Sequence, residues 1–382
     1  MSTTSVEDQR ELAEAVRAFL ARRSPIASVR AAAESVTKDH ASGYDLDLWR
    51  AMGHEIGLQS LAIPEEHGGS GAGWVELGVV MQEFGRALPC VPFLSTVGLG
   101  VSMLLDSGDA AACATWLPRI AAAEVVATAS LTTEAQVRAQ ESAAGWVLDG
   151  MTGHVLDVGI ADVLFVLADT DRGPTVFSVD SPAPSDSMCL TPVKTSDPTR
   201  RVWQVAFTKT PGTVVGAVGG GAAIAQAALR RARVALAAEQ VGVAVAALDM
   251  AVEYGKTRRQ FGRLIGSFQA VKHKLADVLV ATETARSASW ASTRAIDADV
   301  EDAELISRIA TVVCSESAIA AASANVQVHG GIGFTWEHPA HLFVKRSRGN
   351  AVLFGTPRDH RAYLSTLVPV LSGRPNPGAI DA

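Results

Sequence analysis

The spacing of apolar residues changes twice along the 382-residue chain. In residues 6 to about 107, stretches such as VEDQRELAEAVRAFLARRS and GWVELGVVMQEFGRALP carry apolar residues at steps of three and four, which predicts amphipathic helices. From about Glu124 the apolar runs become short and are bounded by Gly, Pro, Asp and Ser, as in ADVLFVLADT and PTVFSVDS, which predicts strands. Helical spacing returns at Ala222 and continues to about Ser372. The pattern therefore predicts the order α, β, α.

This order indicates a mostly α protein with a central β domain. We assign residues 1–120 to an N-terminal helical domain, 121–215 to the β domain, 222–372 to a C-terminal helical bundle and 373–382 to a tail. The stretch AEQVGVAVAALDMAV, residues 238–252, is expected in the core of the bundle.

Composition and charge limit the classes of function and partner that we expect for this chain. Only 5% of the residues are aromatic, and long alanine-rich tracts favour closely packed helices. The net charge of -7 is spread along the chain, so nucleic acid and membrane partners are not expected. The four cysteines lie far apart, and the acidic N-terminus lacks an apolar signal core. We therefore expect a cytoplasmic protein without disulfides.

The connection YGKTRRQFGRLIGSFQAVKHKLAD joins two predicted helices and has two interpretations. In the first it is a helical hairpin, with basic residues at a helix C-terminus, Gly262 as C′ residue and Ser267 as N-cap of the next helix. In the second, the fork-shaped guanidinium of Arg258 or Arg259 binds a phosphate while Phe261 shields it. The sequence of this segment alone leaves both open.

A second candidate is VQVHGGIGFT, which has three glycines within four positions. These glycines cap a helix, or they let backbone N–H groups approach a pyrophosphate without obstruction by Cβ atoms, with Gln327 adding a side-chain amide. A GGxG sequence by itself does not decide between the two.

Taken together and in this order, the two motifs resemble the acyl-CoA dehydrogenase family, and AIPEEHGGSGAGWVELGVVMQEFGRALP resembles its N-terminal domain. The resemblance implies a helical domain, a β-barrel-like domain and a C-terminal four-helix bundle, with FAD between them in a tetramer. It assigns Arg233 and Gly355 to an acyl-CoA substrate. It assigns these residues to FAD, all except the last at a flavin seated mainly in a neighbouring subunit: Arg258, Gln260, Phe261, Phe268, Gln269, Gln327, Gly330, Gly331 and Thr356.

The chain departs from the family at the positions that carry the chemistry. Family members have the catalytic glutamate at the position that matches Phe354, or at the one that matches Ala232, and neither residue here accepts a proton. The two flavin-ring contacts are replaced by SLTTEAQVRAQES and by HVLD, which begins at His154. An aspartate that contacts CoA in relatives matches Arg230. No catalytic residue is therefore assigned.

These losses spare the residues that serve a neighbour's flavin, which favours a heteromeric assembly. The chain resembles one subunit of the α2β2 acyl-CoA dehydrogenases of actinobacteria that act on steroid side-chain thioesters and pass electrons to an acceptor. In this hypothesis FAD is shared at the interface, and a homologous partner carries the glutamate.

Two other hypotheses stay open: a self-sufficient homotetrameric enzyme with a relocated base, and a non-enzymatic helical scaffold. The candidates for a relocated base are Glu134, Asp157, Glu239 and Asp359. The pair His338 and His341 has no evident third ligand, so no metal is expected. The basic run KRSR, residues 345–348, is interpreted as a solvated helix face.

Overall fold

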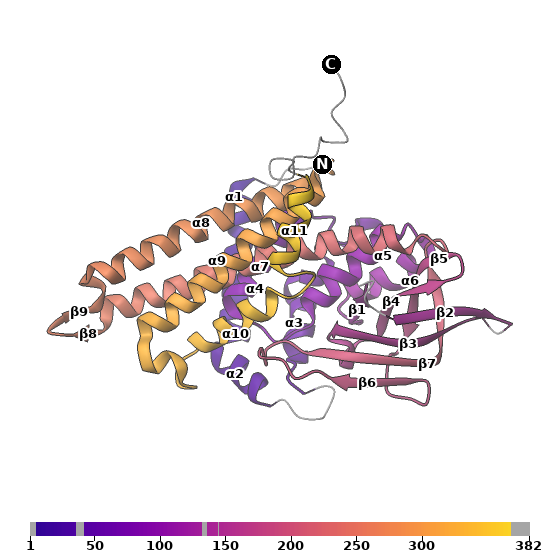
Figure 1. The fold of residues 1–382 in the computed structure, drawn as a ribbon, viewed down its shortest axis with the longest axis horizontal. Helices are drawn as coiled ribbons and strands as arrows, with labels where there is room; N and C mark the ends of the chain where they lie inside the picture. The colour runs from indigo at the N-terminus through magenta and orange to yellow at the C-terminus, as the bar shows by residue number, and fades with distance from the viewer. Residues whose placement is uncertain (1–4, 36–41, 132–135, 144, 368–382) are drawn as a thin grey trace, which may run out of the picture.

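The computed structural model describes residues 5–35, 42–131, 136–143 and 145–367. Helices lie at both ends of this part of the chain and strands in the middle (Figure 1), so the mostly α fold with a central β domain is confirmed. The predicted tail at 373–382 lies outside the described residues. The N-terminal helices are α1 (Val6–Arg23), α2 (Ile26–Glu34), α3 (Leu46–Ile56), α4 (Trp74–Ala87), the π-helical η3 (Leu94–Val101), α5 (Ser102–Ser107) and α6 (Ala110–Ala121).

The N-terminal helices are fixed to the bundle through α4. At its start, the backbone N–H groups of Trp74 and Val75 donate to the Asp297 carboxylate at 2.7 and 3.0 Å, an arrangement that satisfies two unpaired helix donors. Further along, Gly85 lies against the backbone of helix α7 (Gly221–Thr257), where a Cβ would come within 1.9 Å of the Glu239 carbonyl oxygen. The two backbones therefore cross in direct contact.

The strands form one mixed sheet that closes on itself. β4 pairs with β1 in parallel and with β5 antiparallel, β7 joins β5 to β3, and β2 returns from β3 to meet β4. This closure agrees with the predicted barrel-like domain. The strands are β1 (Ala127–Ser130), β2 (Gln136–Ser142), β3 (Gly145–Leu156), β4 (Val163–Thr170), β5 (Gly173–Asp180), β6 (Met188–Pro192) and β7 (Val202–Val215).

Strand β4 shows how the sheet is held on both faces. Leu164 and Val166 point into the barrel and pack with the fully buried Trp203, whereas Val163 and Phe165 belong to the cluster shared with the N-terminal helices and α7. Because successive side chains point to opposite faces, a strand covered on both sides is apolar along its covered length, as in VLFVLA.

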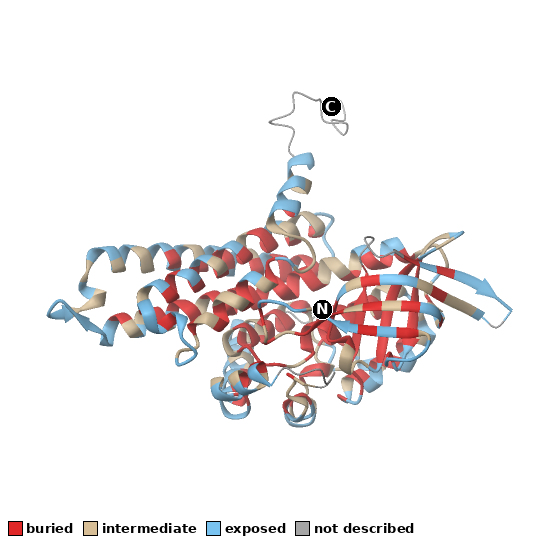
Figure 2. Cartoon of the chain, turned by 60° about the horizontal axis from the view of Figure 1, so that its bottom comes forward, coloured by how far each residue is buried: buried red, intermediate tan, exposed pale blue. Residues whose placement is uncertain are grey.

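The C-terminal bundle is built on α7, which has 37 residues. Most of residues 238–252 are buried, as expected for the core, and buried alanines on α7 and α9 let the helices approach closely. Figure 2 shows the buried residues along the middle of the molecule and exposed residues at the far end of the bundle. The other helices are α8 (Gln269–Asp297), α9 (Ala303–His329), α10 (Ala340–Asn350) and α11 (Pro357–Leu367).

Two segments, Gly221–Thr257 and Ala303–Phe334, are long and apolar enough to cross a membrane by length and composition. In α7, 83% of the most apolar window is buried inside the protein. Core helices of soluble proteins pass the same test, so this hydropathy is accounted for by the packing of the bundle. All four cysteines are free thiols, in agreement with their spacing.

A buried network of charged side chains joins the β domain to the bundle. Arg346 of α10 donates to Asp197 at 2.9 Å and to Glu239 of α7 at 2.8 Å. Arg200 donates to the second oxygen of Glu239 at 2.8 Å. Burial alone would raise the pKa of Glu239, but the positive charges of Arg200 and Arg346 outweigh it and lower this pKa to about 2. The carboxylate is therefore ionised at neutral pH.

This network corrects the interpretation of residues 345–348 as a solvated helix face. Arg346 is only 2% exposed, and Ser347 is buried as well. Only Arg348 is an exposed cation, and Lys345 lies 4.5 Å from the Trp336 ring. The interpretation was wrong because charge alone does not reveal the partners Asp197 and Glu239, which are distant in sequence.

We expect Glu239→Gln to lower the free energy of unfolding by about 3 to 5 kcal/mol, because it removes the carboxylate that the buried Arg346 and the partly buried Arg200 share and leaves Asp197 as the one remaining counter-charge of the network among the described residues. Denaturant unfolding monitored by circular dichroism measures this. The matched control Glu316→Gln removes a half-exposed partner of Arg361 and should cost less than about 1 kcal/mol. Equal small losses in both variants would contradict the structural role given to the network.

Candidate functional site

The first candidate site is the end of the bundle farthest from the β domain. We call residues 256–274 together with 327–334 the bundle tip. Strands β8 (Arg259–Gln260) and β9 (Arg263–Leu264) form a short hairpin there, drawn at the left end of Figure 1. Phe261 and Gly262 make its two-residue turn with φ values of 51° and 77°.

The hairpin corrects two details of the predicted connection. Gly262 is not a C′ residue, because α7 already ends at Thr257 and Gly262 occupies the turn. Ser267 is not the N-cap of α8: its hydroxyl donates to the Leu264 carbonyl at 2.7 Å, and the N-cap is Phe268, without a side-chain bond. The local residues favour turns at both positions, and the strand pairing decides where each turn falls.

The predicted flavin-binding side chains of the hairpin point outward. Arg258, Gln260 and Gln269 are exposed, and Phe261 is 91% exposed. Phe268 is half-buried: Phe261 meets its ring edge to face at 6.1 Å, and the Arg263 guanidinium lies 4.0 Å from the ring centroid. At this exposure Phe261 contributes little to the core of its own chain, and its ring is accessible from outside.

The glycine-rich segment lies at the same end of the bundle. Tyr254, one turn before Arg258, stacks on His329 with ring centroids 4.2 Å apart, and His329 directly precedes Gly330. Gly330 has φ +64°, and a Cβ added at Gly330 or Gly331 meets nothing within 4 Å. Gln327 is exposed one turn earlier. The structure therefore brings the two sequence motifs together.

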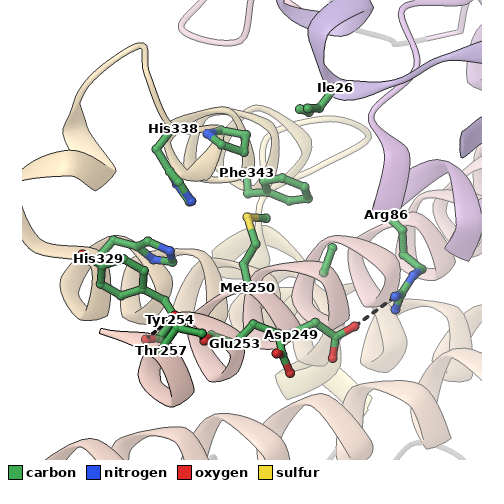
Figure 3. A pocket seen from close by; sticks show the side chains of 12 residues that line it. Ile26, Arg86, Asp249, Met250, Glu253, Tyr254, Thr257, His329, His338 and Phe343 are labelled. Carbon is green, nitrogen blue, oxygen red and sulfur yellow. Dashed lines mark hydrogen bonds and ion pairs between the residues drawn. The ribbon is translucent and has the colours of Figure 1, made fainter. Parts of the chain in front are cut away.

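A shallow pocket of about 600 Å³ lies on the side of this end, between α2, α4, α7 and α10 (Figure 3). Its floor is apolar, with Met250 and Phe343, and the Arg86–Asp249 ion pair of 2.9 Å lies at its rim. Burial, followed by the neighbouring His329, lowers the pKa of His338 to about 4. Within the described residues no group of three or more His, Cys, Asp and Glu side chains could hold a metal ion.

The second candidate site is a cleft of about 1230 Å³ between the β domain and the bundle, which we call the cleft. Its floor is apolar, and five cations and two carboxylates line it. Arg233, Gly355 and Thr356 all lie here. The 25 residues of helix from Arg233 to Arg258 span roughly 37 Å, so one copy of the chain does not bring the cleft and its own bundle tip to one small ligand.

Arg233 is anchored at the inner end of the cleft. Its guanidinium donates to both oxygens of Glu304 at 2.8 Å, and Arg308 donates to the same carboxylate at 2.6 Å. Burial lowers the pKa of Arg233 to about 10, against the opposing effect of Glu304, so the group stays charged at neutral pH. Two guanidinium groups share one carboxylate, which leaves this end of the cleft cationic.

The two positions that the family resemblance assigns to a catalytic glutamate hold Phe354 and Ala232, neither of which is an acid. Phe354 lines the cleft, and Ala232 is fully buried next to Arg233. The cleft's own carboxylates are engaged: Asp197 binds Arg346, and Asp359 accepts hydrogen bonds from the backbone N–H and the hydroxyl of Thr356. The hydroxyl bond is the larger cause of a lowered pKa at Asp359, so this group is a weak base.

Two further candidates for a relocated base, Glu239 and Asp157, lie among the described residues and are engaged elsewhere. Glu239 lies in the buried ion network, and Glu134 lies outside the described residues. Asp157 is buried and accepts hydrogen bonds from Ser95 at 2.6 Å and Tyr44 at 3.1 Å. It is not among the residues that line the cleft.

Comparisons with known proteins agree with this geometry. The family model for the acyl-CoA dehydrogenase N-terminal domain matches residues 6–124, and the model for the acyl-CoA dehydrogenase C-terminal domain matches residues 219–364. The chain therefore belongs to the acyl-CoA dehydrogenase family, a family of FAD-binding oxidoreductases, as the sequence motifs predict.

Among its relatives is acyl-CoA dehydrogenase IpdE2 of Mycobacterium tuberculosis, 37% identical over 365 residues, with 93% of this chain and 96% of the relative covered. The ChsE4-ChsE5 complex from Mycobacterium tuberculosis has a TM-score of 0.86 at 25% identity, covering 98% of this chain and 100% of the other. A variant of the Tcur3481-Tcur3483 steroid ACAD has a TM-score of 0.84 at 27% identity, covering 94% and 97%.

Sequence reasoning missed two parts of this region. The cation Lys194 at the cleft has no motif around it, and Arg348 belongs to the run KRSR that was interpreted as a solvated helix face, so only the fold places the two together. The contact of Asp157 with Ser95 and Tyr44 joins three separate segments. A signal for Asp157 was present, because an acid directly after the apolar HVL at a strand end is unusual, but its partners could not be identified.

We expect the stability of the protein to depend on the ionisation of Asp157. Burial raises the pKa of Asp157 from 3.8 to about 6, against the opposing hydrogen bond from Ser95. The folded state therefore holds this proton more tightly than the unfolded state, and the stability contributed by the protonated group is lost as pH rises through about 6. Asp157→Asn should thus gain roughly 2 to 3 kcal/mol over the wild type between pH 4 and pH 7.

Urea unfolding across this pH range measures the difference. Asp171→Asn is the control, because the Asp171 side chain is 88% exposed and should give no pH-dependent difference. A difference between Asp157→Asn and the wild type that stays constant with pH would overturn the prediction.

Proposed function

We propose that this chain is the base-lacking subunit of a heteromeric, FAD-dependent acyl-CoA dehydrogenase in the cytoplasm. The complex removes a proton from Cα and a hydride from Cβ of an acyl-CoA thioester and passes the electrons to an acceptor. A homologous partner subunit supplies the catalytic glutamate and the flavin-ring pocket, and this chain supplies the pyrophosphate clamp. A steroid side-chain thioester is the favoured substrate, by analogy with the steroid ACAD Tcur3481-Tcur3483.

The bare backbone of the bundle tip is the observation that carries this proposal. A Cβ at Gly330 or Gly331 would face open space, so packing within this chain does not require glycine at these two positions beyond the positive φ of Gly330. A Cβ added at Gly333, by contrast, would come within 3.1 Å of Val326 and His329 of α9. Two glycines facing open space at the same end of the bundle as an exposed guanidinium suit close approach by the phosphates of a ligand held outside the chain.

The side chains around these glycines fit the pyrophosphate of FAD. Arg258 offers an exposed guanidinium without an ion-pair partner among the described residues, and Gln260, Gln269 and Gln327 offer exposed amides. Phe261 provides an apolar cover. These groups bind and orient, and none of them moves a proton.

The chemistry of the bound complex follows from this division of roles. FAD, when bound, accepts the hydride that leaves Cβ of the thioester. The Cα proton needs a carboxylate within hydrogen-bond reach, and the described residues of this chain's cleft offer no free one. The contribution of this chain is therefore to hold the nucleotide in place from across the interface.

The volume of the cleft favours one alternative, a self-sufficient enzyme. At about 1230 Å³ the cleft is large enough for an amphipathic ligand. A self-sufficient enzyme predicts that the chain purified alone is yellow and turns over an acyl-CoA. A family-derived scaffold predicts no flavin even with the cognate partner.

We expect the chain expressed alone to retain little FAD, and co-expression with a base-bearing homologue from the same host to give a yellow complex with one flavin per pair. Arg258→Ala should lower flavin retention by the complex at least about tenfold, because a charge-assisted hydrogen bond contributes about 1.5 to 3 kcal/mol. The ratio of flavin absorbance to protein after gel filtration measures this.

The control is Arg286→Ala, which removes an exposed arginine of α8 that pairs only with Glu283 of its own helix. Its complex should keep its flavin. Full flavin occupancy in the solitary chain would overturn the partner-subunit proposal. Unchanged retention by the Arg258 variant would remove the clamp assignment.

A further inference from the structure

The charge of the bundle tip is opposite to that of the chain as a whole. Residues 256–274 contain six lysines and arginines and no acidic residue, although the net charge of the protein is -7. Lys256 pairs with Glu253, but Arg258, Arg259 and Lys272 are exposed and form no ion pair within the described residues. A bound pyrophosphate would neutralise only part of this charge, so the tip carries a surplus of positive charge.

The cleft of the same chain is cationic as well. Lys194, Arg200, Arg233, Arg308 and Arg348 line it, against the two carboxylates of Asp197 and Asp359. Lys194 and Arg348 are exposed, and no described residue forms an ion pair with either. Asp197 is neutralised by Arg346, and Arg200 pairs with Glu239. Arg233 and Arg308 share Glu304, so Lys194 and Arg348 are the cleft cations without an ion-pair partner within the described residues. Among the described residues that line the cleft, Asp359 is therefore the one exposed carboxylate that opposes these cations.

Apolar side chains at the cleft indicate that its mouth contacts protein. Val352 is 64% exposed and Met151 is 48% exposed, and both line the cleft. Exposed apolar residues rimmed by charges are typical of interaction surfaces.

We infer that repulsion between the cationic bundle tip and the equally cationic cleft opposes pairing of this chain with itself, and that the tip fits a homologous subunit whose cleft mouth is acidic. This inference rests on the proposed function, in which the tip of one subunit reaches the cleft of the other. Like charges placed opposite each other across an interface suppress the wrong partner, and opposite charges speed the encounter with the right one.

Reversing the charge of the cleft mouth and of the bundle tip, first separately and then together, tests the inference on the purified chain without knowledge of the partner. We call this set of variants the charge-swap cycle. Lys194→Glu with Arg348→Glu makes the cleft mouth acidic, and Arg259→Glu with Lys272→Glu makes the tip acidic. All four residues are exposed, and neither Arg259 nor Lys272 is assigned to the flavin clamp. Sedimentation equilibrium measures the self-association constant at about 0.1 M and about 1 M salt, where the Debye length is about 10 Å and about 3 Å.

Either pair of substitutions alone should tighten self-association at least about tenfold at the lower salt concentration, because the tip and the cleft of two copies then carry opposite charge. Combining both pairs restores like charges, so the gain should disappear. It should also disappear at the higher salt concentration. Each pair raises the negative net charge of the chain, so a general charge effect would act in the opposite direction.

The control is Arg119→Glu with Lys209→Glu, two exposed cations of α6 and β7 that belong to neither surface. It makes the same change in net charge and should not tighten self-association. Failure of both pairs to tighten it, or additive gains from the combined pairs, would overturn the inference.

The charge-swap experiment and the flavin-retention experiment can fail independently of each other. If the cycle shows the expected reversal but Arg258→Ala keeps its flavin, the tip meets the cleft and the clamp assignment fails. If flavin retention falls but the cycle shows no coupling, the charge selection is wrong and the proposed function stands.

Discussion

The buried charge network centred on Glu239 connects the β domain to the C-terminal bundle and fixes how the two pack together. Glu239 lies in the middle of α7, Asp197 and Arg200 come from the loop between β6 and β7, and Arg346 comes from α10. Each of these groups would be costly to bury alone, so each needs the others in place. The cleft lies between the same elements, and Asp197 and Arg200 also line it, so the ion pairs that join the β domain to the bundle also fix part of the cleft wall.

Helix α7 imposes the second constraint, which is one of length. It runs from the cleft, at Arg233, to the bundle tip, where Arg258 follows its last residue. A helix cannot fold back on itself, so the two functional surfaces of one copy stay apart. Under the proposed function, the bundle tip of one subunit therefore serves the site of another subunit and not its own.

Much of the fold followed from local patterns. The order of helices and strands and the two family motifs were readable because periodicity and glycine placement are local features. The errors came from contacts between distant segments. Gly262 and Ser267 were assigned to helix ends because the pairing of β8 with β9 was not visible in the sequence. Arg346 was assigned to the surface because its partner Asp197 lies 149 positions away.

For the candidate site, as for the fold, local motifs were visible in the sequence and contacts between distant segments were not. The clustering of the clamp residues came from the family resemblance, and the structure brings the two motifs to one end of the bundle. The cationic lining of the cleft was not predictable, because Lys194, Arg233 and Arg348 come from three separate elements.

The crossing of α4 and α7 has a consequence for how such a chain can change. Gly85 and Gly242 lie at this crossing, and a methyl group at either position would fall 1.9 Å from a carbonyl oxygen of the opposite helix. Even alanine would fit there only if the two helices moved apart. Substitutions can therefore accumulate at the rims of the bundle tip and the cleft. At the contact between the N-terminal helices and the bundle, by contrast, Gly85 and Gly242 leave no room for any larger residue.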